Sequence, residues 1–282
     1  MLRQRVITAL VLVGLLLASL YAPGLWPFAL LTLLLMAAAG WEWGRLNQAA
    51  PALALAMGAA VAVGGAAAWA AGWTVQAPTW LWASALALWL VGGALALRSG
   101  PAAWPRLSRV GRWALGLLAI WLAWLALAQA RSVGINFMLS VLCLVWMADV
   151  AAYFGGRAFG RRKLAPTISP GKSWEGVWSG WVGVVALAAF WIWLDGRMNA
   201  DGPSVYSRLF QQWGAPGLLA TLGLLAGLSV VGDLVESLVK RAAGAKDSSR
   251  LLPGHGGVLD RVDALLPVLP AAMALVAMGN LA

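Results

Sequence analysis

Residues 113–130 read WALGLLAIWLAWLALAQA, a run of eighteen positions without a charged side chain. An α-helix rises about 1.5 Å per residue, so this run nearly crosses the roughly 30 Å hydrocarbon core of a bilayer. Water is absent there, and a helix satisfies its own backbone hydrogen bonds. The run therefore predicts a membrane-spanning helix.

Similar apolar runs occur along the whole 282-residue chain. The composition is 62% hydrophobic and 11% charged, whereas about 25% of residues are charged in an ordinary soluble domain, so a water-soluble globule is excluded. The first run resembles a secretory signal, but eight more follow it, and we treat it as a retained helix. We predict an all-α polytopic membrane protein with nine spans, at residues 6–22, 25–41, 51–71, 80–97, 113–130, 135–152, 177–194, 217–235 and 265–281.

The basic residues predict the orientation of these spans. The formal net charge is +10, which suggests nucleic acid in a soluble protein but marks cytoplasmic loops in a membrane protein. Seventeen of the twenty Lys and Arg residues, Arg3 and Arg5 included, fall on the N-terminal side, against Arg131, Arg197 and Arg208 on the other. We therefore expect a cytoplasmic N-terminus and no nucleic-acid partner. The tryptophans expected to form an interfacial belt are Trp41, Trp43, Trp80, Trp113, Trp174 and Trp213.

Polar chemistry is concentrated in the second half of the chain. Residues 1–132, with about five spans, hold almost no ionisable groups inside the apolar runs and are predicted to be a scaffold. Residues 133–282, with about four spans, carry two polar cytoplasmic segments, 157–173 and 236–263, and are predicted to be the catalytic region. The single cysteine, Cys143, lies inside a span and cannot form an intrachain disulfide.

A polar stripe ends the eighth predicted span. Asp233, Glu236, Ser237 and Lys240 follow one another at i, i+3, i+4 and i+7, so they project from one face of a helix. A carboxylate at membrane depth normally faces a wet cavity or a partner, which makes Asp233 a functional candidate. A salt bridge from Glu236 to Lys240 is the structural alternative for Glu236.

The segment that follows has the residues of an anion-binding turn. Pro253, Gly254, Gly256 and Gly257 predict a tight turn whose backbone N–H groups can approach an anion. His255, the only histidine, lies in this turn, and both a structural role and a contact with phosphate stay open.

Asp260 and Asp263 follow the turn at i and i+3, where they also suit the N-terminus of the ninth span. Capping is therefore one interpretation. The other is that Asp233, Asp260 and Asp263 form a Mg²⁺ site beside phosphates, because hard oxygen ligands lie among many cations. Zinc is not expected with one cysteine and one histidine in the chain. The neighbouring cations are Lys240, Arg241, Lys246, Arg250 and Arg261.

The other polar segment begins with Asp149 and Tyr153, which share a helix face at i and i+4. Its basic residues suit anionic lipid, but such a patch needs no Ser-Pro-Gly-Lys-Ser run after it. That run is not a Walker motif, because Pro166 stands where the pattern requires glycine. Lys172 and a helix starting at Ser173 can still hold phosphate.

These residues together resemble the signature of phosphatidate cytidylyltransferases, the CDP-diacylglycerol synthases. The resemblance covers residues 237–263 without a gap and extends to the 149–176 segment, whereas the N-terminal half is similar only in being apolar. The matching positions are Ser237-x-Val239-Lys240-Arg241, Lys246-Asp247-x-Ser249, Pro253-x-His255-Gly256-Gly257-Val258 and Asp260-Arg261-Val262-Asp263.

The resemblance implies an enzyme in which the phosphate of phosphatidate attacks the α-phosphorus of CTP and releases pyrophosphate. Asp233, Asp260 and Asp263 would hold Mg²⁺, with a second cation such as K⁺ left open. The residues expected to be catalytic are Lys240, Arg241, Lys246, Asp247, His255 and Arg261. Those expected to bind substrate are Ser237, Lys172, Arg157, Tyr153, Gly256 and Gly257.

The implied setting is the bacterial cytoplasmic membrane, with the site facing the cytoplasm, phosphatidate in the bilayer, and a homodimer left open. A CTP-dependent lipid kinase or another liponucleotide synthase is the neighbouring alternative. An ion-coupled transporter would explain Asp149 and Asp233 as intramembrane sites but would give the Gly-His-Gly-Gly turn no role.

Overall fold

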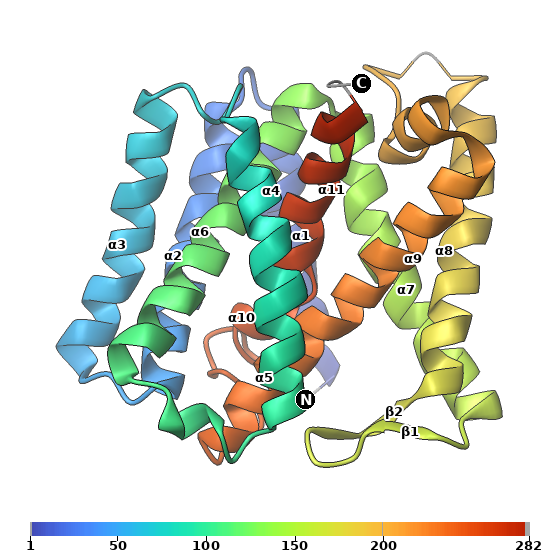
Figure 1. Cartoon of the computed structure of the whole chain (residues 1–282). Coiled ribbons are helices and arrows are strands. Elements are labelled where there is room, and N and C mark those ends of the chain that lie inside the picture. The colour runs from blue at the N-terminus through green and yellow to red at the C-terminus, as the bar shows by residue number, and fades with distance from the viewer. Residues whose placement is uncertain (1, 199, 280–282) are drawn as a thin grey trace.

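The computed structural model describes residues 2–198 and 200–279, with side chains from Val6 onward. Within them the chain is a helical bundle, and the predicted all-α membrane fold is confirmed (Figure 1). Eight helical segments are long and apolar enough to span a membrane, and the apolar part of a ninth helix, Val6–Tyr21, is shorter. The predicted end of the last span, Leu281, and the side chains of Arg3 and Arg5 lie outside the described part.

The helices follow the predicted spans closely, because continuous apolar runs set both. In the first half they are α1 (Leu2–Tyr21), α2 (Trp26–Leu46), α3 (Pro51–Ala70), α4 (Thr79–Leu88), the π-helical turn η1 (Trp89–Gly93), α5 (Ala94–Ser99), the short η2 (Trp104–Arg106) and α6 (Arg109–Val133). In the second half they are α7 (Ile135–Phe159), α8 (Trp174–Asp195), α9 (Val205–Ala242), α10 (Leu259–Val262) and α11 (Leu265–Gly279).

A β-hairpin lies between α7 and α8 and was not predicted. Strands β1 (Lys163–Ala165) and β2 (Ser169–Ser173) are antiparallel, with Lys163 opposite Ser173. The Glu175 carboxylate accepts hydrogen bonds from the backbone N–H of Arg161 at 3.0 Å and of Arg162 at 3.2 Å, which ties the entry of the hairpin to the first turn of α8. Ser173 caps α8 by accepting from the Gly176 N–H, as the predicted turn into a helix requires.

Helices α7 and α8 pack closely because their contact surface is built from small residues. A Cβ added to Gly176 would lie 2.9 Å from the Ala152 carbonyl oxygen, and one added to Gly180 would lie 2.9 Å from that of Ala148. Small residues allow such backbone approach between membrane helices, where lipid gives little hydrophobic drive for association. The hairpin is thereby held over one end of this pair.

Helix α9 crosses the bundle obliquely after a kink (Figure 1). The kink is at Gly214, whose φ of +63° breaks the helix before Pro216. Further along, Gly232 contacts the chain between α10 and α11: a Cβ at position 232 would overlap the Asp263 carbonyl oxygen and approach Pro267 to 2.9 Å. This crossing brings the turn of α9 that carries Asp233 against the segment that carries Asp263.

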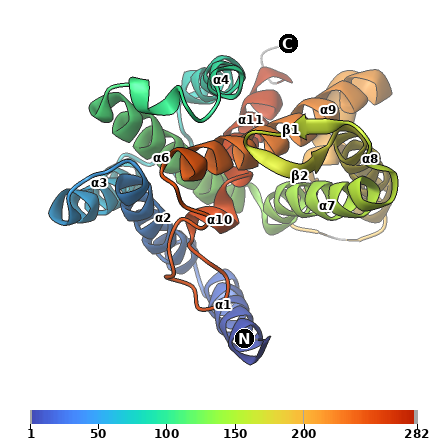
Figure 2. The ribbon, with the colours of Figure 1, turned by 90° about the horizontal axis from the view of Figure 1, so that it is seen from below.

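The two polar segments lie at one end of the bundle. The hairpin and the 243–258 segment are near the N-terminal end of α1, and the end of α11 is at the opposite side (Figure 1). Viewed from that polar end, α10 lies between α2 and α9, and α1 projects away from the other helices (Figure 2). The Thr8 hydroxyl of α1 donates to the Pro253 carbonyl at 3.1 Å.

The two predicted regions form one bundle rather than two packing units. Helix α11 of the second region packs against α4 and α6 of the first as well as against α9. The predicted aromatic belt is wrong for Trp43, which is buried and donates its indole N–H to the Arg112 carbonyl at 2.8 Å. Trp80 and Trp174 are exposed, as anchors would be.

The α9 crossing gives the first testable prediction. Replacing Gly232 by alanine should lower the free energy of unfolding by about 1–3 kcal/mol, because the added Cβ forces α9 away from the Asp263 backbone. The matched control is Gly227→Ala in the same helix, where a Cβ meets no atom within 4 Å. Thermal unfolding of both variants in detergent, followed by circular dichroism, measures the difference. Equal midpoints would contradict this account of the crossing.

Candidate active site

Nine of the fifteen predicted site residues line two clefts at the polar end. The first, which we call the hairpin cleft, has a volume of about 730 Å³ and lies between α7, α8, α9 and the β-hairpin. Its lining includes Asp149, Tyr153, Arg157, Lys172 and Asp233.

Two contacts order this cleft. The Arg157 guanidinium donates to the Tyr153 hydroxyl at 3.3 Å, one helical turn earlier on α7, a pair that was not predicted from the sequence. The Lys172 ammonium on β2 donates to the Asp233 carboxylate on α9 at 2.5 Å, and the Ser237 hydroxyl donates to the other oxygen of Asp233 at 3.2 Å. The unpredicted hairpin therefore delivers a lysine directly to the predicted α9 carboxylate.

The second, which we call the loop cleft, has a volume of about 730 Å³ and is formed by the segment between α9 and α10. The Nδ1 atom of His255 is buried and has no hydrogen-bond partner among the described residues. The predicted residues that line this cleft are Lys246, Asp247, His255, Gly256 and Arg261. Arg241 lines neither cleft; its guanidinium donates to the Ile168 carbonyl in the hairpin turn at 3.4 Å.

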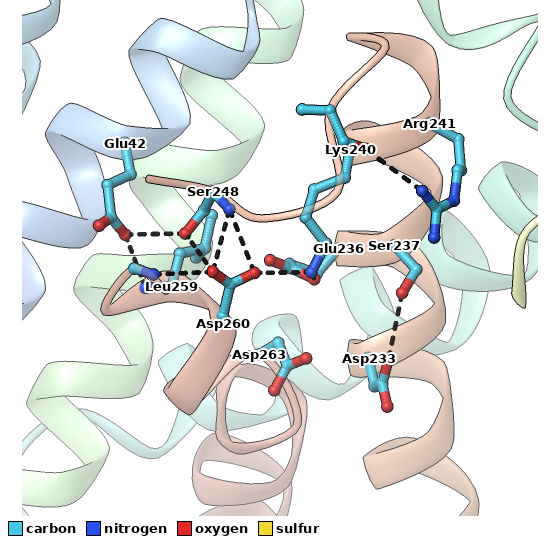
Figure 3. A network of polar contacts seen from close by, with 12 residues as sticks. Glu42, Asp233, Glu236, Ser237, Lys240, Arg241, Ser248, Leu259, Asp260 and Asp263 are labelled. Carbon is cyan, nitrogen blue, oxygen red and sulfur yellow. Dashed lines mark hydrogen bonds and ion pairs between the residues drawn. The ribbon is translucent and has the colours of Figure 1, made fainter. Parts of the chain in front are cut away.

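A network of buried charges joins α9 to α10 (Figure 3). The Lys240 side chain, 12% exposed, contacts the Glu236 carboxylate one turn earlier on α9 and the Asp260 carboxylate on α10 at 2.6 Å. The side chains of Glu236 and Asp260 are 2% and 5% exposed. The predicted Glu236–Lys240 pair therefore exists, but it is shared with Asp260 and holds two elements together.

Both oxygens of the Asp260 carboxylate have hydrogen-bond partners within the protein. Its carboxylate accepts from the Gly257 N–H at 2.8 Å, from the Ser248 N–H at 2.9 Å and from the Ser248 hydroxyl at 2.9 Å. The backbone N–H groups of the predicted turn do point at an anion. For Gly257 that anion is the carboxylate of Asp260, which belongs to the protein and not to a substrate. These donors precede Asp260 in the chain, so its carboxylate holds the loop rather than capping α10.

The three predicted metal ligands do not form one ligand set. Across residues 2–198 and 200–279, no group of three or more His, Cys, Asp or Glu side chains lies close enough to hold an ion by itself. Asp263 lies between Asp260 and Asp233 (Figure 3), near enough to Asp233 for their charges to repel. Its carboxylate accepts from the Ala264 N–H at 2.7 Å and has no ion-pair partner among the described residues.

The charges around α9 do not balance. The carboxylates of Asp233, Glu236, Asp260 and Asp263 face only two ammonium groups, those of Lys172 and Lys240. Fully ionised, this cluster has two negative charges in excess, which is costly in a low-dielectric bundle. A divalent cation or bound protons would offset it.

Comparison with known proteins agrees with this chemistry. A family model described as the cytidylyltransferase family matches residues 3–278. A phosphatidate cytidylyltransferase of Pseudomonas aeruginosa is 38% identical over 278 residues, which cover 98% of this chain and 97% of that protein. The chain belongs to the cytidylyltransferase family. The resemblance inferred from the signature is thus confirmed.

Other cytidylyltransferases match about half of the chain. The phosphatidate cytidylyltransferase of Haemophilus influenzae is 45% identical over 137 residues, which cover 49% of this chain and 44% of that protein. That of Staphylococcus aureus is 39% identical over 143 residues, which cover 50% of this chain and 49% of that protein.

Sequence reasoning missed one polar residue of this cytidylyltransferase. Glu42 was placed just beyond the second span, in the half expected to be a scaffold, but α2 continues to Leu46 and buries it completely. Its carboxylate accepts hydrogen bonds from Ser248, Ser249, Val258 and Leu259. The only available signal was an acid between two tryptophans at the end of an apolar stretch.

The two lysines that pair with carboxylates of α9, Lys172 and Lys240, should respond differently to removal. Lys240→Met leaves Glu236 and Asp260 buried without a cation, so we expect a loss of about 3–5 kcal/mol in the free energy of unfolding. Lys172→Met acts on a pair whose side chains are 26% and 30% exposed, so the expected loss is below about 1 kcal/mol. Thermal unfolding in detergent checks both; a Lys172 variant as unstable as the Lys240 variant would refute the distinction.

Proposed function

We propose that the protein transfers a cytidylyl group from CTP to phosphatidate, giving CDP-diacylglycerol and pyrophosphate. A phosphate oxygen of phosphatidate forms a bond to the α-phosphorus of CTP, and the bond from that phosphorus to the β,γ-pyrophosphate breaks. The observation that carries the proposal is the full-length match to a cytidylyltransferase, taken together with clefts rich in cations at one end of the bundle.

The reaction joins two polyanions and needs no covalent nucleophile. Catalysis therefore depends on positioning and on neutralising charge at the phosphates. In our proposal Lys172 and Arg157 neutralise phosphate in the hairpin cleft, where the Tyr153 hydroxyl adds a hydrogen bond. Lys246, Arg261 and the unpaired Nδ1 of His255 contact phosphate in the loop cleft. Lys240 fixes the distance between α9 and α10 through its two carboxylates.

We further propose Mg²⁺ as the cofactor, held by Asp233 and Asp263. Mg²⁺ is usually bound by one or two protein carboxylates and completed by water and substrate phosphates, and these two side chains supply that donor set. Asp260, whose oxygens are occupied by Lys240 and backbone N–H groups, would orient the site rather than bind the ion. The bound ion would supply charge stabilisation at the phosphates. A second cation such as K⁺ stays a proposal for metal titration to test.

The orientation follows from the same arrangement. Both polar segments and the N-terminal end of α1 lie at one end, and seventeen of the twenty basic residues belong to that side by the span assignment. We propose that this end faces the cytoplasm of a bacterial inner membrane, where CTP is found, and that the acyl chains of phosphatidate stay in the bilayer. A homodimer is a proposal that light scattering of the detergent-solubilised protein tests.

The site makes a prediction for carboxylate variants. With purified protein, phosphatidate, Mg²⁺ and CTP labelled at the α-phosphorus, label should enter lipid, whereas γ-label should appear in pyrophosphate. Asp263→Asn should lower this transfer at least about 100-fold, because loss of groups that only orient a ligand already costs about 10–100-fold. Asp201→Asn, an exposed carboxylate outside both clefts, is the control. Entry of γ-label into lipid would instead identify a kinase.

Metal removal tests the cofactor separately. Treatment with EDTA should abolish formation of the liponucleotide, and added Mg²⁺ should restore it, because the excess negative charge around α9 otherwise repels the triphosphate. Thermal unfolding of the treated protein should have a lower midpoint, because removal of the ion leaves the excess negative charge around α9 without compensation. Undiminished turnover in EDTA would refute the Mg²⁺ assignment while leaving the transferase proposal standing.

A further inference from the structure

Glu42 is a carboxylate without a cation. It projects from α2 and is 0% exposed, and among the described residues it forms no ion pair with Lys, Arg or His. A buried carboxylate is costly unless hydrogen bonds compensate it. The groups that donate hydrogen bonds to the Glu42 carboxylate therefore indicate its role.

All its hydrogen-bond partners belong to the segment that leads into α10. One oxygen accepts from the Ser249 hydroxyl at 2.5 Å and the Val258 N–H at 3.0 Å. The other accepts from the Leu259 N–H at 2.7 Å and lies 3.3 Å from the Ser248 hydroxyl. Four donors from both ends of the twelve-residue segment 248–259 thus converge on one side chain of α2.

The same loop holds the charged network described above. The Ser248 hydroxyl lies between Glu42 and Asp260 and shares its single proton between them (Figure 3). Leu259 directly precedes Asp260, which pairs with Lys240 of α9. Gly257 has no room for a side chain, since a Cβ there would overlap Ser248 and Glu42. A shift of Glu42 would therefore move Asp260 and, one turn later, Asp263.

We infer that Glu42 is a positioning residue of the cytidylyl transfer. It fixes the 248–259 segment on α2, so that Asp260 reaches Lys240 and Asp263 faces Asp233. The expected change in kcat rests on the proposed function, whereas the statement that Glu42 fixes the 248–259 segment does not. This role of Glu42 makes the N-terminal helices part of the catalytic assembly, although none of their residues lines either cleft.

The central test is Glu42→Gln, which keeps the shape but turns an NH₂ group toward N–H and O–H donors. We expect kcat for CTP-dependent transfer to fall about 10- to 100-fold in protein that is still folded. Trypsin, applied well below the unfolding temperature, should cleave after the exposed Arg250 faster than in the wild type, because the loop is no longer fixed. Full kcat with unchanged cleavage would overturn the inference.

Two further variants keep the test decisive. Thr32→Val is the matched control: Thr32 is a buried polar residue of the same helix whose hydroxyl bonds only carbonyls of α2, so both readouts should match the wild type. Ser249→Ala removes one of the four donors and replaces the central test if Glu42→Gln does not fold. It should accelerate cleavage after Arg250 and lower kcat, and unaltered values would again overturn the inference.

Failure of the two proposals is distinguishable. If wild type and Thr32→Val both lack cytidylyl transfer, the proposed function is wrong, and the rate of cleavage after Arg250 still decides whether Glu42 fixes the loop. If transfer is present and Glu42→Gln loses it only in proportion to the unfolded fraction, Glu42 stabilises the fold without positioning the site.

Discussion

Backbone N–H groups that are buried away from water have to find their hydrogen-bond partners within the protein. The segment from Ser248 to Leu259 meets this constraint with two acidic side chains. Asp260 accepts from Ser248 and Gly257, and Glu42 accepts from Val258 and Leu259. The two carboxylates accept hydrogen bonds from the loop as a bound anion would. Groups of the protein itself therefore hold the glycine-rich turn in shape before a nucleotide binds.

The same arrangement concentrates negative charge. Once Asp260 has been used to hold the loop, Lys240 serves two buried carboxylates, and Lys172 on the hairpin serves Asp233. Asp263 is left without an ion-pair partner in the described structure. A cluster of this kind attracts divalent cations and repels bare triphosphate, which explains why the clefts on either side of it are lined by Lys and Arg. The ion pairs that join α9 to α10 and to the hairpin therefore also set the charge of the proposed site.

Close helix crossings set the distances in this cluster. Gly232 lets α9 touch the backbone at Asp263, and the small residues between α7 and α8 hold the hairpin over the end of that pair. Neither crossing was predicted from the sequence. The small residues are visible in the sequence, but a glycine in an apolar run does not indicate which helix will pack against it. The hairpin escaped prediction for a related reason: two short strands carry too few residues for a periodic pattern.

The sequence by itself determined the helical membrane fold and the position of nearly every helix. An apolar run of about the length needed to cross the bilayer is stable in lipid as a helix, which satisfies its own backbone hydrogen bonds. The sequence also determined the family, through a signature of polar residues at fixed spacing, and the i, i+4 pair Glu236–Lys240, because helical geometry alone sets that spacing. Only the tertiary structure decided that Lys172 meets Asp233, that Asp260 holds a loop, and that Glu42 reaches across 206 to 217 residues of chain to fix it. Those contacts depend on how helices cross, and crossing is decided by the packing of whole surfaces, which no local pattern records.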